Sequence, residues 1–380
     1  MARRSERIPL VTAAPGTRHE LLVHRYGTLG ARPKAYLQAS LHADETPALL
    51  AQHHLIRLLD QADQKGAIKG EIVLVPYANP IGLAQHVNGT QLGRYELAGG
   101  GNFNRNWPDL FTPVADRLGG RLTDSAEANV TMVREAMGEL LRGFTARRGL
   151  DALRLELARR AYDADFVLDL HCDDDSLMHL FLTPEHWPDG ADLAAELGCR
   201  AVLLCEDSGG ASFDETFSTP WTKLAARFPD KPIPPACFSC TVELRGQADV
   251  SDALAEGDAR ALFRFLQRRG LVAGDPGPLP EPLCEATRLD ACDTVRAPAS
   301  GVLSYAVELG SQVRKGDVIA HLIDPAAEHP EDGRQAITCA GDGLVMSRRA
   351  HKFAYTGFTI AKIVGREPLP HRQGANLLED

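Results

Sequence analysis

The sequence lacks the features of several protein classes. No stretch reaches the roughly 18 consecutive apolar residues of a membrane span, and the first ten residues, MARRSERIPL, contain no apolar signal-peptide core. We therefore expect no membrane partner and a cytoplasmic location. Eight scattered cysteines in 380 residues are too few for a disulfide scaffold, so reduced thiols are expected. Cys237 and Cys240 form a CxxC without a second pair, which favours a structural role over zinc or redox chemistry.

Positive charge is also scarce. The chain has 41 Lys and Arg against 51 Asp and Glu, a formal net charge of −10. This excess of negative charge repels phosphate backbones, so nucleic acid is not an expected partner. With 380 residues, 44% of them hydrophobic, the chain can bury a core around an active site and has room for two or three domains.

The pattern of apolar residues predicts an α/β fold. Short runs rich in β-branched residues alternate with longer segments of helical periodicity. We expect strands at 35–40, 72–76, 166–170, 201–204 and in the run into Glu243, and helices at 47–64 and 252–269. Pro47 suits a first helical turn because its missing N–H needs no partner there.

A proline-rich segment predicts a domain boundary. Residues 274–283, GDPGPLPEPL, cannot continue a helix or a central strand and have the composition of a semi-rigid connector. We therefore divide the chain into a domain of residues 1–275, a linker of residues 276–284 and a small domain of residues 285–370.

The small domain contains a weak internal repeat. Residues 297–303 match 339–345, and residues 316–322 match 357–363, with offsets of 42 and 41 residues. Glycines between short β-branched runs predict two similar all-β halves. This pattern resembles the lipoyl/biotinyl barrel-sandwich, but Ile323-Asp324-Pro325 stands where the modifiable lysine would be. We therefore expect no attached biotin or lipoate.

Two histidines and one glutamate could form a catalytic metal site. His42 and Glu45 follow one predicted strand, and His171 ends another. The carboxyl ends of strands are where α/β sheets form their sites. A set of two histidines and one glutamate leaves a fourth position open on zinc, as catalysis requires. The alternatives are a solvated loop around His42 and a core or substrate-contacting His171.

The segment 101–108, GNFNRNWP, is too polar for a core and too rich in hydrogen-bonding side chains for a plain turn. Asn104 and Arg105 could bind a substrate carboxylate at two points, because an arginine fork next to an amide matches that geometry. Arg94 could direct a guanidinium at a developing oxyanion, although a surface position is equally compatible with the sequence.

Glu243 lies at the end of a β-rich run, TVELRG. Close to a metal-activated water, its carboxylate could accept the proton during attack and return it to the leaving amine. The alternative is a salt bridge to Arg245 or to a more distant basic residue.

Acidic residues gather after His171, at 173–175, and again at Asp214 and Glu215. A solvated or metal-proximal acidic loop would explain them. Alternatively, carboxylates such as those of Asp214 and Glu215 bind a cation at the far end of the substrate. That hypothesis favours N-acylated basic amino acids over N-acylated glutamate or aspartate.

The order His-x-x-Glu, Asn-Arg, His, Glu, followed by a small β domain, resembles the succinylglutamate desuccinylase/aspartoacylase family of the zinc metallocarboxypeptidase clan. The resemblance spans roughly residues 30–365, and a helical insert near 115–160 is similar to a less characterised bacterial branch. It implies a three-layer α/β/α catalytic domain with a mixed sheet and one zinc ion per chain. The residues it implies are His42, Glu45 and His171 as zinc ligands, Glu243 as general base and acid, Asn104 and Arg105 at a substrate carboxylate, and, by a looser match, Arg94 at the oxyanion.

The resemblance implies a zinc-dependent amidohydrolase that removes an acyl group from a small-molecule N-acyl amino acid. A metallocarboxypeptidase acting on small peptides and a non-catalytic ligand-binding regulatory protein are the alternatives. A homo-oligomer is compatible with the sequence. The acyl group and the amino acid cannot be read from it.

Overall fold

A large mixed β-sheet forms the centre of the first part of the chain. The computed structural model describes residues 3–12 and 14–372. The sheet has nine strands in the order β1-β2-β4-β3-β9-β13-β11-β12-β14. Their bounds are β1 Arg4–Pro9, β2 Glu20–Tyr26, β3 Lys34–Ala39, β4 Glu71–Val75, β9 Phe166–Asp173, β11 His179–Leu182, β12 Ala201–Leu204, β13 Phe238–Gly246 and β14 Ala286–Arg288. Strands β4, β3, β9 and β13 run parallel, whereas β1, β2 and β11 pair antiparallel with a neighbour.

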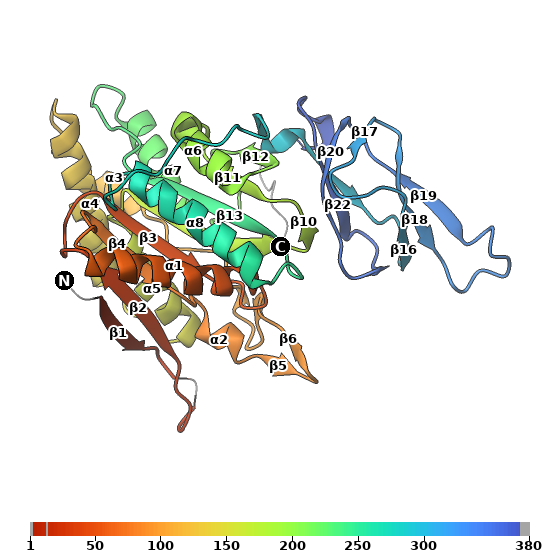
Figure 1. Ribbon diagram of the computed structural model, residues 1–380, viewed down its shortest axis with the longest axis horizontal. Helices are drawn as coiled ribbons and strands as arrows, with labels where there is room; N and C mark the ends of the chain where they lie inside the picture. The colour runs from red at the N-terminus through yellow and green to blue at the C-terminus, as the bar shows by residue number, and fades with distance from the viewer. Residues whose placement is uncertain (1–2, 13, 373–380) are drawn as a thin grey trace.

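Helices cover both faces of this sheet, which confirms the predicted three layers (Figure 1). Strand β3 is buried along its whole length, and its side chains alternate between the faces. Tyr36 belongs to one hydrophobic core and Leu37 to the other. One face packs against α1 Pro47–Gln64, α6 Trp187–Leu197 and α8 Asp252–Arg268, and the other against α3 Phe111–Leu118, α4 Ala126–Gly143, α5 Gly149–Ala161 and α7 Phe213–Arg227.

The two helices that the periodicity predicts are both present. Helix α1 has the expected bounds and carries Pro47 in its first turn. Helix α8 begins after Ser251, whose side chain accepts a hydrogen bond from the Leu254 amide. The expected helical insert is formed by α3, α4 and α5.

Several short elements connect the longer strands and helices. They are α2 Pro80–Leu83, β5 His86–Val87, β6 Thr90–Gln91, β7 Tyr95–Glu96, β8 Gly101–Asn102, β10 Asp175–Ser176 and the 3-10 turn η1 Pro184–His186. The eight cysteines are free, and Cys237 and Cys240 are both buried at β13 or just before it. No helix among the described residues is long and apolar enough to cross a membrane.

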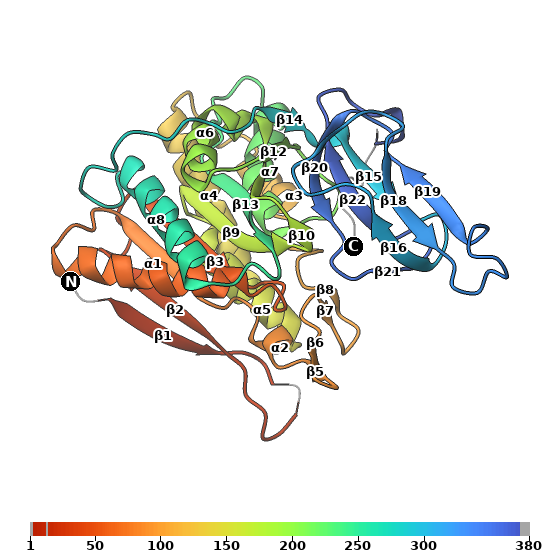
Figure 2. The same cartoon turned by 45° about the vertical axis from the view of Figure 1, so that its right-hand side comes forward.

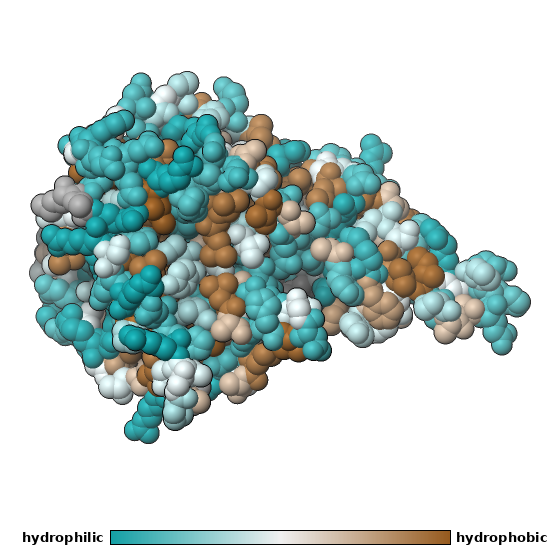
Figure 3. Space-filling model, turned by 60° about the horizontal axis from the view of Figure 1, so that its bottom comes forward, coloured by the Kyte–Doolittle hydropathy of each residue, from teal (hydrophilic) through white to brown (hydrophobic). Residues whose placement is uncertain are grey.

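The last part of the chain forms two small antiparallel sheets beside the large one, and one of these small sheets also includes β10 (Figure 2). We call residues 292–364 the β domain. Its strands are β15 Cys292–Arg296, β16 Gly301–Tyr305, β17 Gln312–Val313, β18 Val318–Ile323, β19 Arg334–Thr338, β20 Gly343–Arg348, β21 Phe353–Ala354 and β22 Thr359–Val364, flanked by the 3-10 turns η2 Leu289–Ala291 and η3 Pro370–Arg372. Hydrophilic side chains cover most of the face shown in Figure 3.

The two halves of the internal repeat form equivalent strand pairs, and each half also supplies one short strand to the other sheet, since β17 pairs with β20 and β21 pairs with β16. In the first half β16 pairs with β18, and in the second half β20 pairs with β22. The proline-rich residues 274–283 contain no helix or strand. Strand β20 also pairs with β10, so the β domain is joined by backbone hydrogen bonds to the segment that follows His171.

Candidate active site

Two adjacent parallel strands bring the predicted metal ligands together. His42 and Glu45 lie in the turn between β3 and α1, and His171 lies near the end of β9, the neighbour of β3. All three side chains are buried, and one ligating atom of each lies within 4.8 Å of the others. The Nδ1 atoms of His42 and His171 lie 3.0 and 2.7 Å from the two carboxylate oxygens of Glu45. Their positions suit a single cation.

The outer nitrogen of each imidazole has its own partner. His42 Nε2 lies 2.8 Å from Asn102 Oδ1, and His171 Nε2 lies 2.9 Å from Asp169 Oδ2. Asp169 is fully buried, and its other oxygen accepts a hydrogen bond from Gln38. Such partners fix the ring orientation and direct the Nδ1 lone pairs inward. Burial, together with the charge of Arg94, lowers the pKa of His42 to about 4, which keeps it in the neutral form that binds a metal.

Glu243 lies beside this cluster on β13, directly across from His171 in the β9–β13 pairing. Its Oε2 is buried and has no hydrogen-bond partner among the described residues. Burial and the charge of Glu45 raise the pKa of Glu243 to about 8. Arg245 does not pair with it but forms a two-point ion pair with Asp258, its Nη1 3.0 Å from Asp258 Oδ1. The alternative salt bridge of Glu243 to Arg245 is therefore not formed, and within residues 3–12 and 14–372 no basic side chain lies within ion-pair distance of Glu243.

Arg94 and Asn104 both touch the cluster. The Arg94 Nη1 lies 3.2 Å from Glu45 Oε1 and from His42 Nδ1. Asn104 Oδ1 accepts a hydrogen bond from the Phe213 amide, and its Nδ2 lies 3.4 Å from His171 Nε2. The Asn104 side chain therefore holds protein atoms here, and its contact with a substrate stays a prediction.

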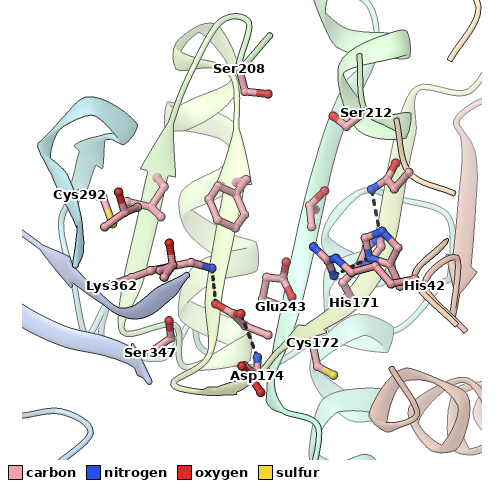
Figure 4. Close-up of a pocket in the computed structure, with 18 of the residues that line it drawn as sticks. His42, His171, Cys172, Asp174, Ser208, Ser212, Glu243, Cys292, Ser347 and Lys362 are labelled. Carbon is pink, nitrogen blue, oxygen red and sulfur yellow. Dashed lines mark hydrogen bonds and ion pairs between the residues drawn. The ribbon is translucent and has the colours of Figure 1, made fainter. Parts of the chain in front are cut away.

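A cavity of about 940 Å³ opens in front of these residues. Arg94, Arg105 and Glu243 line it from the catalytic side. The β domain contributes the other wall, including Phe358 and Lys362. Figure 4 shows His42, His171 and Glu243 together on one side of this pocket and Lys362 reaching toward them from the other.

Two acids that follow His171 pair with cations of the β domain. Asp173 Oδ2 lies 2.6 Å from the Lys362 ammonium, and Asp175 Oδ2 lies 3.1 Å from Arg348 Nη2. Burial opposes the ionisation of Asp173, but the Lys362 charge outweighs it and holds the pKa of this carboxyl below its usual range. Asp173 and Asp175 therefore form ion pairs that link the segment after His171 to the β domain.

The other predicted acids, Asp214 and Glu215, line the cavity at the start of α7. Both are buried. Asp214 accepts a hydrogen bond from the Ser212 hydroxyl, and Glu215 Oε1 accepts one from the Ser208 amide. Glu215 Oε2 is buried without a partner among the described residues. Burial and the charge of Glu215 raise the pKa of Asp214 to about 7.

Sequence reasoning missed the roles of Asn102, Asp169 and Lys362. Asn102 lies in the polar segment already singled out, and Asp169 stands two residues before His171, on the same face of its strand. Both positions could have been read as partners of the histidines. No signal around Lys362 pointed to the site, because its contact depends on how the β domain packs.

Comparison with known proteins identifies the family. A model of the succinylglutamate desuccinylase/aspartoacylase catalytic domain matches residues 31–269. No curated protein matches the chain. A solved family protein from Shewanella amazonensis SB2B has a TM-score of 0.83 and 24% identity over 95% of this chain and 98% of its own.

Two further solved structures share the fold. A family protein from Shewanella frigidimarina NCIMB 400 has a TM-score of 0.82 and 23% identity, with 95% of this chain and 97% of that chain covered. The ectoine utilization protein EutE (DoeB) from Ruegeria pomeroyi has a TM-score of 0.65 and 17% identity, with 96% and 95% covered. Because the family model covers more than half of the sequence, this chain belongs to the succinylglutamate desuccinylase/aspartoacylase family of deacylase-type hydrolases.

Proposed function

We propose that this protein is a zinc-dependent amidohydrolase that removes an acyl group from a small N-acyl amino acid. The observation that carries the proposal is the unpartnered, buried oxygen of Glu243 beside three convergent ligand atoms of His42, Glu45 and His171. Two imidazoles and one carboxylate are the donor set of catalytic zinc, and they leave a coordination position open.

Each residue of the site has its own proposed role in amide hydrolysis. Zinc, when held by the two histidines and Glu45, would supply Lewis acidity to the scissile carbonyl and to water. Glu243 takes a proton from the attacking water and delivers it to the leaving nitrogen, a role that suits a carboxyl with a pKa of about 8. Arg94 stabilises the negative charge that develops on the carbonyl oxygen.

The cavity favours a small substrate. Its volume of about 940 Å³ lies within the roughly 300–1,000 Å³ of small-molecule pockets, and the β domain forms one wall. Arg105 lines the cavity and is the residue we propose for the free carboxylate of the amino acid.

The test is hydrolysis of a panel of N-succinyl, N-acetyl and N-formyl amino acids, together with dipeptides, by purified protein of known metal content. The proposal expects release of an amino acid from at least one N-acyl substrate, loss of this activity on chelation and recovery with zinc. Faster cleavage of dipeptides than of every N-acyl amino acid would identify a carboxypeptidase instead. Turnover of none of them by zinc-loaded protein would favour a ligand-binding protein.

We further propose that Asp214 and Glu215 bind a positive charge on the amino-acid side chain. An unpartnered buried carboxylate oxygen in a cavity wall suits a cationic ligand group, because the cation would replace the water that burial removes. The expected preference for N-acyl lysine or ornithine over N-acyl glutamate is roughly ten- to a hundredfold in kcat/KM.

Measured kcat/KM values for the basic and the acidic substrates test this preference. Glu215→Gln should narrow the difference, whereas Glu139→Gln, at an exposed position on α4, is the matched control and should leave it unchanged. Equal or higher values for the acidic substrates would refute the role of the two carboxylates.

A further inference from the structure

The Lys362–Asp173 ion pair joins the β domain to the active site at one point. Lys362 lies on β22, and its ammonium reaches Asp173 Oδ2 at 2.6 Å. The other oxygen of Asp173 accepts a hydrogen bond from the Asp174 amide. Both side chains of the pair are largely buried, 25% and 17% exposed, and both line the catalytic cavity. Figure 4 shows Lys362 extending across the pocket toward Glu243.

Asp173 is close to the candidate ligands along its own strand. Side chains two residues apart on a strand point to the same face, so Asp173 shares a face with His171. Asp169 belongs to this face too, and its carboxylate does contact the His171 ring. A carboxylate is a good zinc ligand, and a fourth protein ligand would close a site that catalysis needs open.

We propose that Lys362 is a positioning residue of the active site: it holds the Asp173 carboxylate at the cavity wall and prevents it from joining His42, Glu45 and His171 as a fourth ligand. This inference rests on the proposed function. The β domain would then influence catalysis directly, because Lys362 of β22 restrains Asp173 of the large sheet. The two residues are almost 190 positions apart in the chain.

The central experiment is a double-mutant cycle read through metal affinity and turnover. In Lys362→Met the released carboxylate should raise zinc affinity at least about threefold and lower kcat at least about tenfold. In Lys362→Met with Asp173→Asn there is no carboxylate to release, so both quantities should return to within about threefold of the wild-type values. Lys315→Met, which removes an equal charge from an exposed position of the β domain, is the matched control.

A pair that merely fastens the β domain can also recover kcat in the double variant, because that variant no longer buries an unpaired charge. Zinc affinity separates the two cases: a fall in kcat in Lys362→Met without a rise in zinc affinity would show a merely structural pair and overturn the proposal. A double variant as slow as Lys362→Met would overturn the proposal. So would a Lys362→Met protein whose kcat and zinc affinity both stay within twofold of the wild type. The visible spectrum of cobalt-substituted protein supplies a further readout, since an added carboxylate ligand should change the absorption bands in Lys362→Met and not in the double variant.

Two measurements keep the test decisive if Lys362→Met does not fold or no substrate is found. Asp173→Asn alone should keep kcat within about threefold, and a loss of more than tenfold with zinc still bound would show that Asp173 itself acts in catalysis. Zinc affinity by chelator competition and the cobalt spectrum need no substrate. They test Lys362 even if the wild-type protein hydrolyses no N-acyl amino acid, a result that would count against the proposed function alone.

Discussion

The buried polar side chains of the active site fall into two groups, those that hold a histidine ring and those with an oxygen that has no partner in the part of the chain that the structure describes. Asn102 and Asp169 each contact the outer nitrogen of a histidine, whereas one oxygen of Glu243 and one of Glu215 have no partner among the described residues. An unpaired buried polar atom costs about 1–3 kcal/mol of stability. Fixed partners orient the site, and the two unpartnered oxygens mark the places where water or substrate is expected to bind.

Glu243→Gln tests the proton transfer. The amide cannot accept the proton of the attacking water, so kcat should fall by a factor of at least about 10². Zinc content and KM should stay close to those of the wild type, because Gln has nearly the same shape and Glu243 is not among the three ligands. Turnover within a few-fold of the wild type would rule out the role.

Asp169→Asn tests the support of His171. The neutral side chain loses the charge that orients the ring and raises its basicity, so zinc affinity should fall by about 10- to 100-fold. Chelator competition measures this, with Asp116→Asn at an exposed position of α3 as the control. Equal affinities in the two variants would show that Asp169 does not support the ligand.

The sequence predicts which side chains lie together at the site where a strand ends in a polar residue. His42, Glu45, His171 and Glu243 were all predicted to lie together, and the structure places them side by side. Partners supplied from another segment, such as Lys362, were not predicted, because a surface lysine and one that enters a distant cavity look alike in sequence.

At the scale of elements, the segment from α2 to β8 brings Arg94 to the metal cluster. Gly93 permits this, since its carbonyl accepts a hydrogen bond from the Ala43 amide and a Cβ atom at Gly93 would lie 2.1 Å from the Asp44 nitrogen. Contacts that short do not occur, so any side chain at position 93 has to displace the backbone.

Gly93→Ala should therefore move Arg94 away from Glu45 and lower kcat/KM at least about tenfold. Gly119→Ala is the matched control, because the nearest heavy atom to its added Cβ is 3.8 Å away. Normal kcat/KM in Gly93→Ala would contradict the positioning of Arg94 by this segment.

Several elements with clear periodicity could be predicted, whereas β2, α6, α7 and the shortest strands were not. Helix α1 and strand β12 have the bounds that periodicity and turn residues predict. Two-residue strands such as β7, β8 and β10 carry no detectable alternation, and only tertiary packing defines them. Because β8 and β10 flank the site, the details of its walls could not be read from sequence.

At the scale of the whole molecule, the β domain forms a wall of the cavity. The repeat predicted its two similar halves, but not its docking, which depends on the β10–β20 pairing and on ion pairs between distant segments. The connection between β18 and β19, which contains Asp324-Pro325, lacks a lysine.

The β domain should therefore carry no biotin or lipoate. Intact mass spectrometry of protein from its native host should give the mass of the unmodified chain, with a known biotin-carrying protein from the same cells as the control. A mass increase equal to either cofactor would overturn this interpretation.

The zinc content of purified protein tests the central claim most directly. We expect one zinc ion per chain in the wild type and in His53→Ala, an exposed position on α1, and less than about one tenth of an ion in folded His171→Ala. A full equivalent of zinc in His171→Ala, or none in the wild type, would contradict the account.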